Sequence, residues 1–336
     1  MVRFYIIFKQ GFPHTQQQVI QLIKRGDLEI SFFLTNHLKN NMRSKKSSYL
    51  AFLICLIYIC FSGFISDKQV YPRLGIVSGL TQDSLAYVSG FKMIGESVPK
   101  MLSPALSDDK FNANLKKIKA AKCKVLSCNL FYPASLKIAG PEVDEAKVLT
   151  YTETVLSRAG QAGVKFIVLG SSGARSIPAD YDVVKAKSDF VILAGKLARI
   201  AGKYKVTILL ENLETTETNF ITSLKSAAEI VREVNHLNFR LNADIYHMMR
   251  EGESPNEIIE AGALIGFSEV AEKQNRTLPG VMGDDFRPYL RALHKINYKG
   301  FIFIEGSIKN AATEMPLAFK YLSAQIAEVY SEKKID

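Results

Sequence analysis

The sequence predicts a (β/α)₈ barrel, or TIM barrel, over residues 70–330, and three observations lead to it. Short apolar runs typical of buried strands alternate eight times with longer amphipathic stretches typical of helices. The first run and its continuation, IVSGLTQDS, contain no G-x-G-x-x-G loop, which an open doubly wound sheet would carry there. Acidic residues end several runs, as expected where parallel strands deliver side chains to one mouth of a barrel.

The predicted strands are eight apolar runs of seven to nine residues. In order they are RLGIVSG (73–79), FKMIGES (91–97), KVLSCNLF (124–131), KFIVLGS (165–171), VTILLEN (206–212), FRLNADI (239–245), ALIGFSEVA (263–271) and FIFIEGS (301–307). The stretch between the first two, LTQDSLAYVSG, is short for a full helix. The later helical patterns include DKFNANLKKIKAA, EAKVLTYTETVLSRAGQAG, AKSDFVILAGKLARIAGK, SLKSAAEIVREV, DDFRPYLRALHKI and the closing MPLAFKYLSAQIAEVYSEKK.

The net charge of +10 does not indicate a nucleic-acid partner. Residues 1–68 hold nine Lys and Arg against three Asp and Glu, whereas the rest of the chain holds 34 against 30. Those later charges alternate in sign along the helical stretches, as on a solvated surface. No arginine-rich run is interleaved with aromatic residues, so we expect no nucleic acid to bind.

An apolar segment near the N-terminus predicts export. Three basic residues stand within five positions from Met42, and YLAFLICLIYICFSGFI (49–65) follows without a charged residue. The small residues Ser62 and Gly63 lie at its end. A basic start, an apolar centre and small residues after it are typical of a secretory signal, which we place at 42–66.

Two other interpretations of this segment stay open. Its 17 residues approach the ~20 that span a bilayer, so it can be a membrane anchor, and Cys60 can carry a lipid, although its flanking residues make a poor lipidation motif. In each case the barrel is exported, either to the periplasm or attached to a membrane and facing outward. Residues 1–41 precede this segment and are expected to be a non-native or disordered extension outside the fold.

Acidic residues at the predicted strand ends are the most informative chemical feature. Glu211 ends VTILLE, Asp244 ends FRLNAD and Glu305 ends FIFIE, while LIGFSEVAE offers Glu269. A single acid in such a place is more often a helix cap. Several strands ending this way predict a metal or acid–base site at the barrel mouth.

Several motifs in order across residues 70–330 resemble one family, the sugar phosphate isomerase/epimerase superfamily of xylose-isomerase-like barrels, which includes the tagatose and psicose 3-epimerases. The spacings of 33 from Glu211 to Asp244 and of 29 from Arg276 to Glu305 agree with the epimerase pattern. The motifs are SLKIAGPEVDEA, FIVLGSSGARSIP, ENLETTETN, LNADIYHMM, EKQNRTLPG and FIFIEGS.

The resemblance implies a metal-dependent proton transfer. In such epimerases two glutamates, an aspartate and a histidine hold one divalent ion, and the two glutamates move a proton on and off the carbon beside a carbonyl. By motif, Glu211 and Glu305 become the acid–base pair and metal ligands, and Asp244 becomes a ligand. The ion polarises the carbonyl and stabilises an enediolate.

Four further residues are expected to contact substrate. Glu217, His247 and Arg276 match substrate-contacting positions of the family motifs. Arg175 follows the fourth strand on the same face, where it can hold a phosphate or carboxylate or form a structural ion pair.

The chain departs from the family in strand seven. The family shows a His-x-His pair there, whose second histidine binds the metal, whereas this chain has Phe267 and Glu269. Glu269 is either a replacement ligand or a residue that faces away. Four oxygen ligands would move the preference from Mn²⁺ or Zn²⁺ towards Mg²⁺ or Ca²⁺, so the expected cofactor is Mg²⁺, Mn²⁺ or Ca²⁺.

The expected function is that of a metal-dependent isomerase or epimerase acting on a sugar or keto-sugar derivative. One alternative is a non-catalytic sugar-binding barrel that has lost the ligand histidine. Another is a lyase or dehydratase acting on oxidised sugars. A DNA-repair endonuclease on the same barrel would need several histidines for a zinc cluster, and the chain has five histidines in all, two of them before residue 42. The sequence leaves open whether the barrel forms a homo-oligomer.

Overall fold

The computed structural model of the protein describes residues 2–8, 28–34 and 71–332. The chain divides into two compact units, 1–68 and 69–336. In the first unit, strand β1 (Val2–Phe8) pairs antiparallel with β2 (Leu28–Leu34).

The predicted signal or anchor at 42–66 lies outside the described residues, as does most of the extension expected at 1–41. Among the described residues, no helix combines the length and the apolar character needed to cross a membrane. Export therefore stays a prediction.

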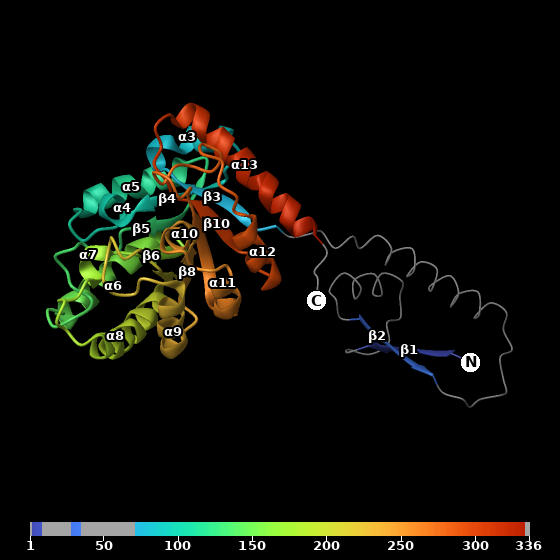
Figure 1. Ribbon diagram of the computed structural model, residues 1–336, viewed down its shortest axis with the longest axis horizontal. Helices are drawn as coiled ribbons and strands as arrows, with labels where there is room; N and C mark the ends of the chain where they lie inside the picture. The colour runs from blue at the N-terminus through green and yellow to red at the C-terminus, as the bar shows by residue number, and fades with distance from the viewer. Residues whose placement is uncertain (1, 9–27, 35–70, 333–336) are drawn as a thin grey trace. The chain divides into compact units, whose positions relative to one another are not determined.

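The second unit is a closed barrel of eight parallel strands in the order β10-β3-β4-β5-β6-β7-β8-β9, with the helices outside it (Figure 1). This confirms the predicted fold class, and each strand falls within a predicted run. The strands are β3 (Arg73–Val77), β4 (Met93–Ser97), β5 (Lys124–Asn129), β6 (Phe166–Leu169), β7 (Thr207–Glu211), β8 (Phe239–Asp244), β9 (Ile265–Val270) and β10 (Phe301–Ile304).

Helices follow the strands and form the outer layer. Between the first two barrel strands there is only the short pair η1 and α3, in agreement with the short segment expected there. The helical elements of the barrel unit are η1 (Leu80–Gln82), α3 (Asp83–Val88), α4 (Val98–Met101), α5 (Asp108–Ala120), α6 (Glu145–Ala162), α7 (Ser172–Arg175), α8 (Val183–Tyr204), α9 (Leu224–Val234), α10 (Ile245–Glu251), α11 (Asn256–Ala261), η2 (Gly262–Leu264), α12 (Arg287–Lys295) and α13 (Ala311–Ser331).

Local sequence starts the long helices. The side chains of Asp144 and Asp182 accept backbone N–H groups at the starts of α6 and α8. Ser223 and Ser226 form a reciprocal capping box at the start of α9. Such caps stabilise a helix by about 1 kcal/mol each because they satisfy N–H groups that have no partner inside the helix.

Two apolar layers hold the barrel. The larger one lies between strands and helices, and the smaller one fills the barrel interior with five buried residues, Leu126, Val168, Leu209, Phe267 and Phe303. Each fully buried side chain of this size contributes about 1.5–3 kcal/mol. The interior is therefore a solid core, and polar chemistry is left to the strand ends above it.

Candidate active site

Four carboxylates converge at the carboxyl ends of successive strands. Glu211 and Asp244 are the last residues of β7 and β8, Glu269 lies in β9, and Glu305 follows β10 directly. One carboxylate oxygen from each lies within 4.8 Å of the others. The strand register explains this, because Asp244 is level with Glu269 on the neighbouring strand.

Glu269 faces into this cluster and is fully buried. Its Oε1 accepts a hydrogen bond from the amide of Asn129 at 3.3 Å, and its Oε2 accepts one from the amide of Asn242. Phe267, at the other position where the family shows a histidine, lies in the barrel interior with its ring centroid 4.8 Å from that of Phe303. Of the two positions, only Glu269 therefore delivers a polar group to the mouth.

Asp244 uses its two oxygens differently. Oδ1 accepts the backbone N–H groups of Tyr246 at 2.8 Å and His247 at 3.3 Å, which starts α10. Oδ2 is buried and has no hydrogen-bond partner among the described residues. The carboxylate of Asp244 thus caps α10 with one oxygen and faces the site with the other.

Arg276 brings a positive charge into the cluster. Its Nη2 lies 2.5 Å from Oε2 of Glu305 and 3.5 Å from Oδ2 of Asp244, and its Nη1 lies 3.7 Å from the carboxylate of Glu217. The guanidinium carbon is 4.6 Å from the ring centroid of Tyr246, which gives a cation–π contact. The predicted contact residues Arg276 and Glu217 therefore meet at the rim of the site.

The loop that carries Arg276 is held by a buried carboxylate, Glu272. Its oxygens accept the Thr277 hydroxyl at 2.7 Å and the backbone N–H groups of Gly280 and Gly283 at 2.7 and 2.8 Å. The backbone of Arg276 is left-handed, with φ 50°. Residues other than glycine adopt this region at a cost, so the loop must hold Arg276 in place.

His247 lies below the surface of the site. Its Nε2 is 3.6 Å from Oδ2 of Asp244, and neither ring nitrogen has a hydrogen-bond partner among the described residues. His247, Asp244 and Glu211 form a second group whose ligand atoms lie within 4.8 Å of one another. The structure thus brings His247 to the carboxylates themselves.

Arg175 requires a correction, because it does not face the site. The side chain is fully buried, and its Nη1 and Nη2 donate to the backbone carbonyls of Glu211 at 2.7 Å and Ile221 at 3.1 Å. It has no surface with which to hold a substrate phosphate or carboxylate. Its contacts instead fix the end of β7 and the loop that follows.

Burial and mutual repulsion act on the two innermost glutamates. Burial raises the pKa of Glu211 well above its ordinary value, and the nearby charges of Glu269, Glu305 and Asp244 raise it further. Burial also raises the pKa of Glu269, followed by the charges of Glu305 and Asp244. The amides of Asn242 and Asn129 oppose this second shift because they donate to the ionised form.

Glu305 is the most open of the four, with 23% of its side chain exposed. Burial still raises its pKa, and the Arg276 guanidinium opposes the rise. For Arg276, burial alone would lower the pKa, but the carboxylates of Asp244, Glu305 and the two inner glutamates together raise it above its usual range.

The donor set fits a divalent cation. Four carboxylates face one guanidinium, so an uncompensated negative charge stays in a buried place unless protons or a cation balance it. Oδ2 of Asp244 makes no hydrogen bond among the described residues, and its nearest cationic atom, Nη2 of Arg276, lies 3.5 Å away. Carboxylate oxygens are the ligands that Mg²⁺ and Ca²⁺ prefer.

Sequence reasoning missed the two amides and a glycine. Asn129 ends β5, as the acids end their strands, and Asn242 stands two residues before Asp244 and so shares its side of β8. Gly170 follows β6, where any Cβ would overlap Oε2 of Glu211. Applying the strand-end rule to amides as well as acids would have found Asn129.

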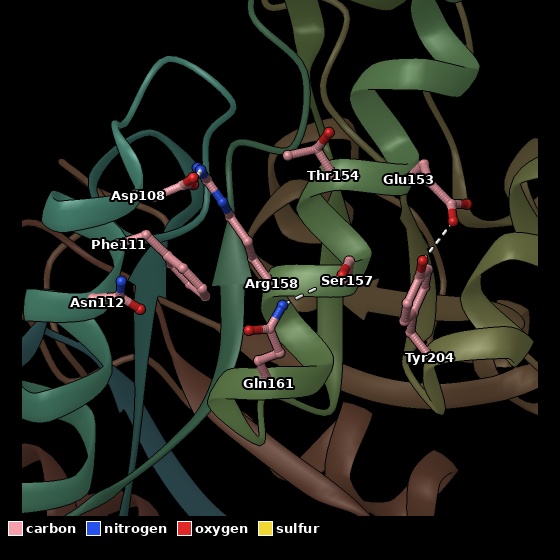
Figure 2. A pocket seen from close by; sticks show the side chains of 9 residues that line it. All are labelled: Asp108, Phe111, Asn112, Glu153, Thr154, Ser157, Arg158, Gln161 and Tyr204. Carbon is pink, nitrogen blue, oxygen red and sulfur yellow. Dashed lines mark hydrogen bonds and ion pairs between the residues drawn. The ribbon is translucent and has the colours of Figure 1, made fainter.

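A separate hollow of about 460 Å³ lies on the outside of the barrel along α5 and α6, as Figure 2 shows. Several of its polar groups already pair with one another. Arg158 lies 3.1 Å from Asp108, and Gln161 donates to Ser157 at 3.4 Å. We assign no function to this hollow.

Comparisons with known proteins agree with this fold. A family model described as a xylose isomerase-like TIM barrel matches residues 86–324. The L-ribulose 3-epimerase of Methylomonas sp. is 29% identical over 120 residues, which are 35% of this chain and 42% of that protein. The chain spans less than half the length of the curated relatives it matches.

Solved structures share the fold. A 3-keto-D-glucoside 4-epimerase from E. coli superposes with a TM-score of 0.64 at 17% identity, over 75% of this chain and 99% of that one. Another structure, which holds a zinc atom, superposes with a TM-score of 0.62 at 19% identity, over 77% of this chain and 100% of that one. At these identities the structural similarity shows that the fold is shared. Family membership is shown by the family model, which covers more than half of the sequence. The chain belongs to the xylose isomerase-like TIM barrel family.

Proposed function

We propose that the protein is a metal-dependent isomerase or epimerase acting on a sugar or keto-sugar derivative through an enediolate, with Glu211 and Glu305 as the acid–base pair. The family to which the chain belongs and its sugar-epimerase relatives support an isomerase or epimerase. The residue roles are those that the motif resemblance implies, and the geometry of this chain supports them.

The observation that carries the proposal is the convergence of Glu211, Asp244, Glu269 and Glu305 within 4.8 Å at the barrel mouth. A divalent ion bound there would supply the charge that polarises a substrate carbonyl and acidifies the neighbouring C–H bond. The residues that would hold it are these four carboxylates, with His247 adjacent.

Proton transfer needs two groups on opposite sides of one carbon. One glutamate of the pair accepts the proton from the carbon beside the carbonyl, and the electron pair moves into the enediolate. The other donates a proton to the opposite face of that carbon, which inverts it. Alternatively, a proton returns to the adjacent carbon while the hydroxyl proton moves from one oxygen to the other, which moves the carbonyl. Glu211 and Glu305 come from β7 and β10, so they approach the site from different strands.

Substrate hydroxyls would meet a charged rim. Arg276 and Glu217 pair at 3.7 Å and are partly exposed, so both are free to exchange this weak contact for hydrogen bonds to a sugar. The cation–π contact with Tyr246 keeps the guanidinium aimed across the mouth.

We further propose that the barrel works outside the cytoplasm, because a basic start and an uncharged apolar segment at 49–65 precede it. Phosphorylated sugars are scarce there, so a free ketose or an oxidised glycoside is the favoured substrate class.

Hydrogen exchange tests the proposal. The full chain is incubated in D₂O with ketoses and keto-glycosides, with Mg²⁺, Mn²⁺ or Ca²⁺, and deuterium at the carbon beside the carbonyl is followed by NMR. We expect exchange that depends on the cation and disappears in Glu305→Gln. Absence of exchange with every ketose and every ion would overturn the catalytic proposal.

The Glu305→Gln variant also distinguishes the catalytic proposal from the alternative of a non-catalytic sugar-binding barrel. In that case Glu305→Gln would bind sugar as well as the wild type does, and metal analysis would find no bound ion. A product that has lost water or a leaving group would instead indicate a lyase or dehydratase.

A further inference from the structure

Both carboxylate oxygens of Glu269 accept hydrogen bonds from asparagine amides on two other strands. Asn129, at the end of β5, donates to Oε1 at 3.3 Å, and Asn242 of β8 donates to Oε2. Asn129 is 140 residues away in sequence, so the contact exists only because the barrel closes. Both amides are at least nine-tenths buried.

The direction of these amides follows from the charge of Glu269. The Oδ1 atoms of Asn129 and Asn242 are buried and have no hydrogen-bond partner among the described residues. Turning either amide would place its Oδ1 against an oxygen of Glu269, and the ionised carboxylate can only accept hydrogen bonds. Each asparagine therefore leaves its own carbonyl unpaired in order to donate to Glu269.

One of the two amides also reaches the acid–base pair. The Nδ2 group of Asn129 donates to Oε1 of Glu305 as well as to Glu269. A single amide thus ties the carboxylates of β9 and β10 together. The side-chain amide of Asn242, by contrast, donates to Glu269 and to no other of the four carboxylates.

We propose that Asn129 and Asn242 are positioning residues that fix Glu269 as an oxygen ligand and make the site select Mg²⁺ or Ca²⁺ over Zn²⁺. An amide N–H uses one lone pair on each oxygen of Glu269 and leaves the others available, and one of these oxygens lies within 4.8 Å of oxygens of Glu211, Asp244 and Glu305. This inference rests on the proposed function, because it takes the carboxylate cluster for a cation site.

The selectivity follows from ligand number. Ca²⁺ takes six to eight oxygen ligands and Mg²⁺ takes six, of which water supplies several, so a fourth carboxylate held in place adds an oxygen ligand that both ions can use. Zn²⁺ is satisfied by about four ligands and accepts the imidazole of His247, which lies beside Glu211 and Asp244. Loosening Glu269 should therefore weaken Mg²⁺ and Ca²⁺ more than Zn²⁺.

The test is metal binding to the full chain by isothermal titration calorimetry, with Mg²⁺, Ca²⁺ and Zn²⁺ in turn. Asn242→Leu removes the donor at similar size, and Asn114→Leu is the matched control, because the Asn114 amide donates to the carbonyl of Lys100, away from the mouth. We expect Asn242→Leu to weaken Mg²⁺ and Ca²⁺ binding by about ten- to a hundredfold and Zn²⁺ binding by less, and the control to match the wild type.

Each outcome decides the inference. Unchanged Mg²⁺ and Ca²⁺ affinity in an Asn242→Leu protein with the wild-type circular dichroism spectrum would overturn it, and so would equal weakening of all three ions. If that variant does not fold, Asn129→Ser is measured against the same expectation. A wild-type chain that binds none of the ions would overturn the proposed metal dependence itself, and this inference with it.

Discussion

The guanidinium of Arg276 lies 2.5 Å from the carboxylate of Glu305, so the most exposed of the four clustered acids has its own counter-cation. The same guanidinium is 3.5 Å from Asp244. Arg276 therefore holds part of the cluster's charge in balance when no other cation is bound. Within the part of the chain that the structure describes, the two inner glutamates, Glu211 and Glu269, form no ion pair.

Arg276→Met should make the protein depend more strongly on divalent cations. The variant leaves partly buried carboxylates without their guanidinium, so we expect unfolding free energy to fall by roughly 1–3 kcal/mol in chelator. Added Ca²⁺ or Mg²⁺ should raise the thermal midpoint more in the variant than in the wild type. The control is Arg287→Met, which breaks a surface pair with Asp285. Equal losses in both variants would contradict the counter-cation role.

Glu211→Gln should separate activity from stability. We expect cation-dependent deuterium exchange to fall by about 10²- to 10⁴-fold, because one proton-transfer group is lost. Without cations the thermal midpoint should rise, since burial and like charges raise the pKa of this carboxyl and an amide carries no charge to bury. Glu328→Gln, on the surface, should change neither. A lower midpoint in Glu211→Gln without cations would count against the repulsion argument.

Arg175→Met should destabilise the barrel, although Arg175 is not among the residues that face the site. The change removes the donors to the carbonyls of Glu211 and Ile221, both in a fully buried place, and should cost roughly 3 kcal/mol in urea unfolding. Arg199→Met, on the exposed face of α8, is the control and should cost little. A variant as stable as this control would show that the buried guanidinium is dispensable.

Glu253 should make stability fall as pH rises. Burial raises its pKa from 4.5 to about 7, although its carboxylate accepts the Leu224 N–H at 2.9 Å. Between these values the folded chain binds more protons than the unfolded chain, so unfolding free energy decreases with pH. Because the group is partly exposed, we expect about 1–2 kcal/mol over this window.

Glu253→Gln isolates that contribution. Glutamine keeps an acceptor for the Leu224 N–H but has no proton to lose. The stability of the variant relative to the wild type should therefore grow from pH 4.5 to 7, as followed by chemical unfolding at each pH. Glu260→Gln, at an exposed position, should run parallel to the wild type. A constant difference between Glu253→Gln and wild type would disprove the shift.

The fold was open to prediction because the barrel repeats one pattern. Each strand is an apolar run, buried on both faces, and several helices, α8 among them, begin at a side chain such as Asp182 that accepts the first N–H groups. These are local properties, so the sequence carries them. The position of Glu211, Asp244 and Glu305 follows from the same pattern, because a strand's last residue in a barrel can only point towards the mouth or the helices.

Contacts across the barrel could not be predicted from the sequence in the same way. Asn129 reaches Glu269 and Glu305 over 140 and 176 residues, and no local pattern encodes such a distance. The short helix α7 turns Arg175 inward beneath Glu211, although its place after β6 suggested the mouth. The position of a residue at a strand end follows from the local pattern, whereas the direction of its side chain depends on how the rest of the chain packs around it.

Asp244 links the binding of a ligand at the barrel mouth to the first turn of α10. One of its oxygens holds the N–H groups of Tyr246 and His247, while the other is free for whatever the mouth binds. A ligand that engages the free oxygen must also stiffen the first turn of α10. Slower amide hydrogen exchange at these two positions would therefore register occupancy directly, with no substrate known and no turnover required.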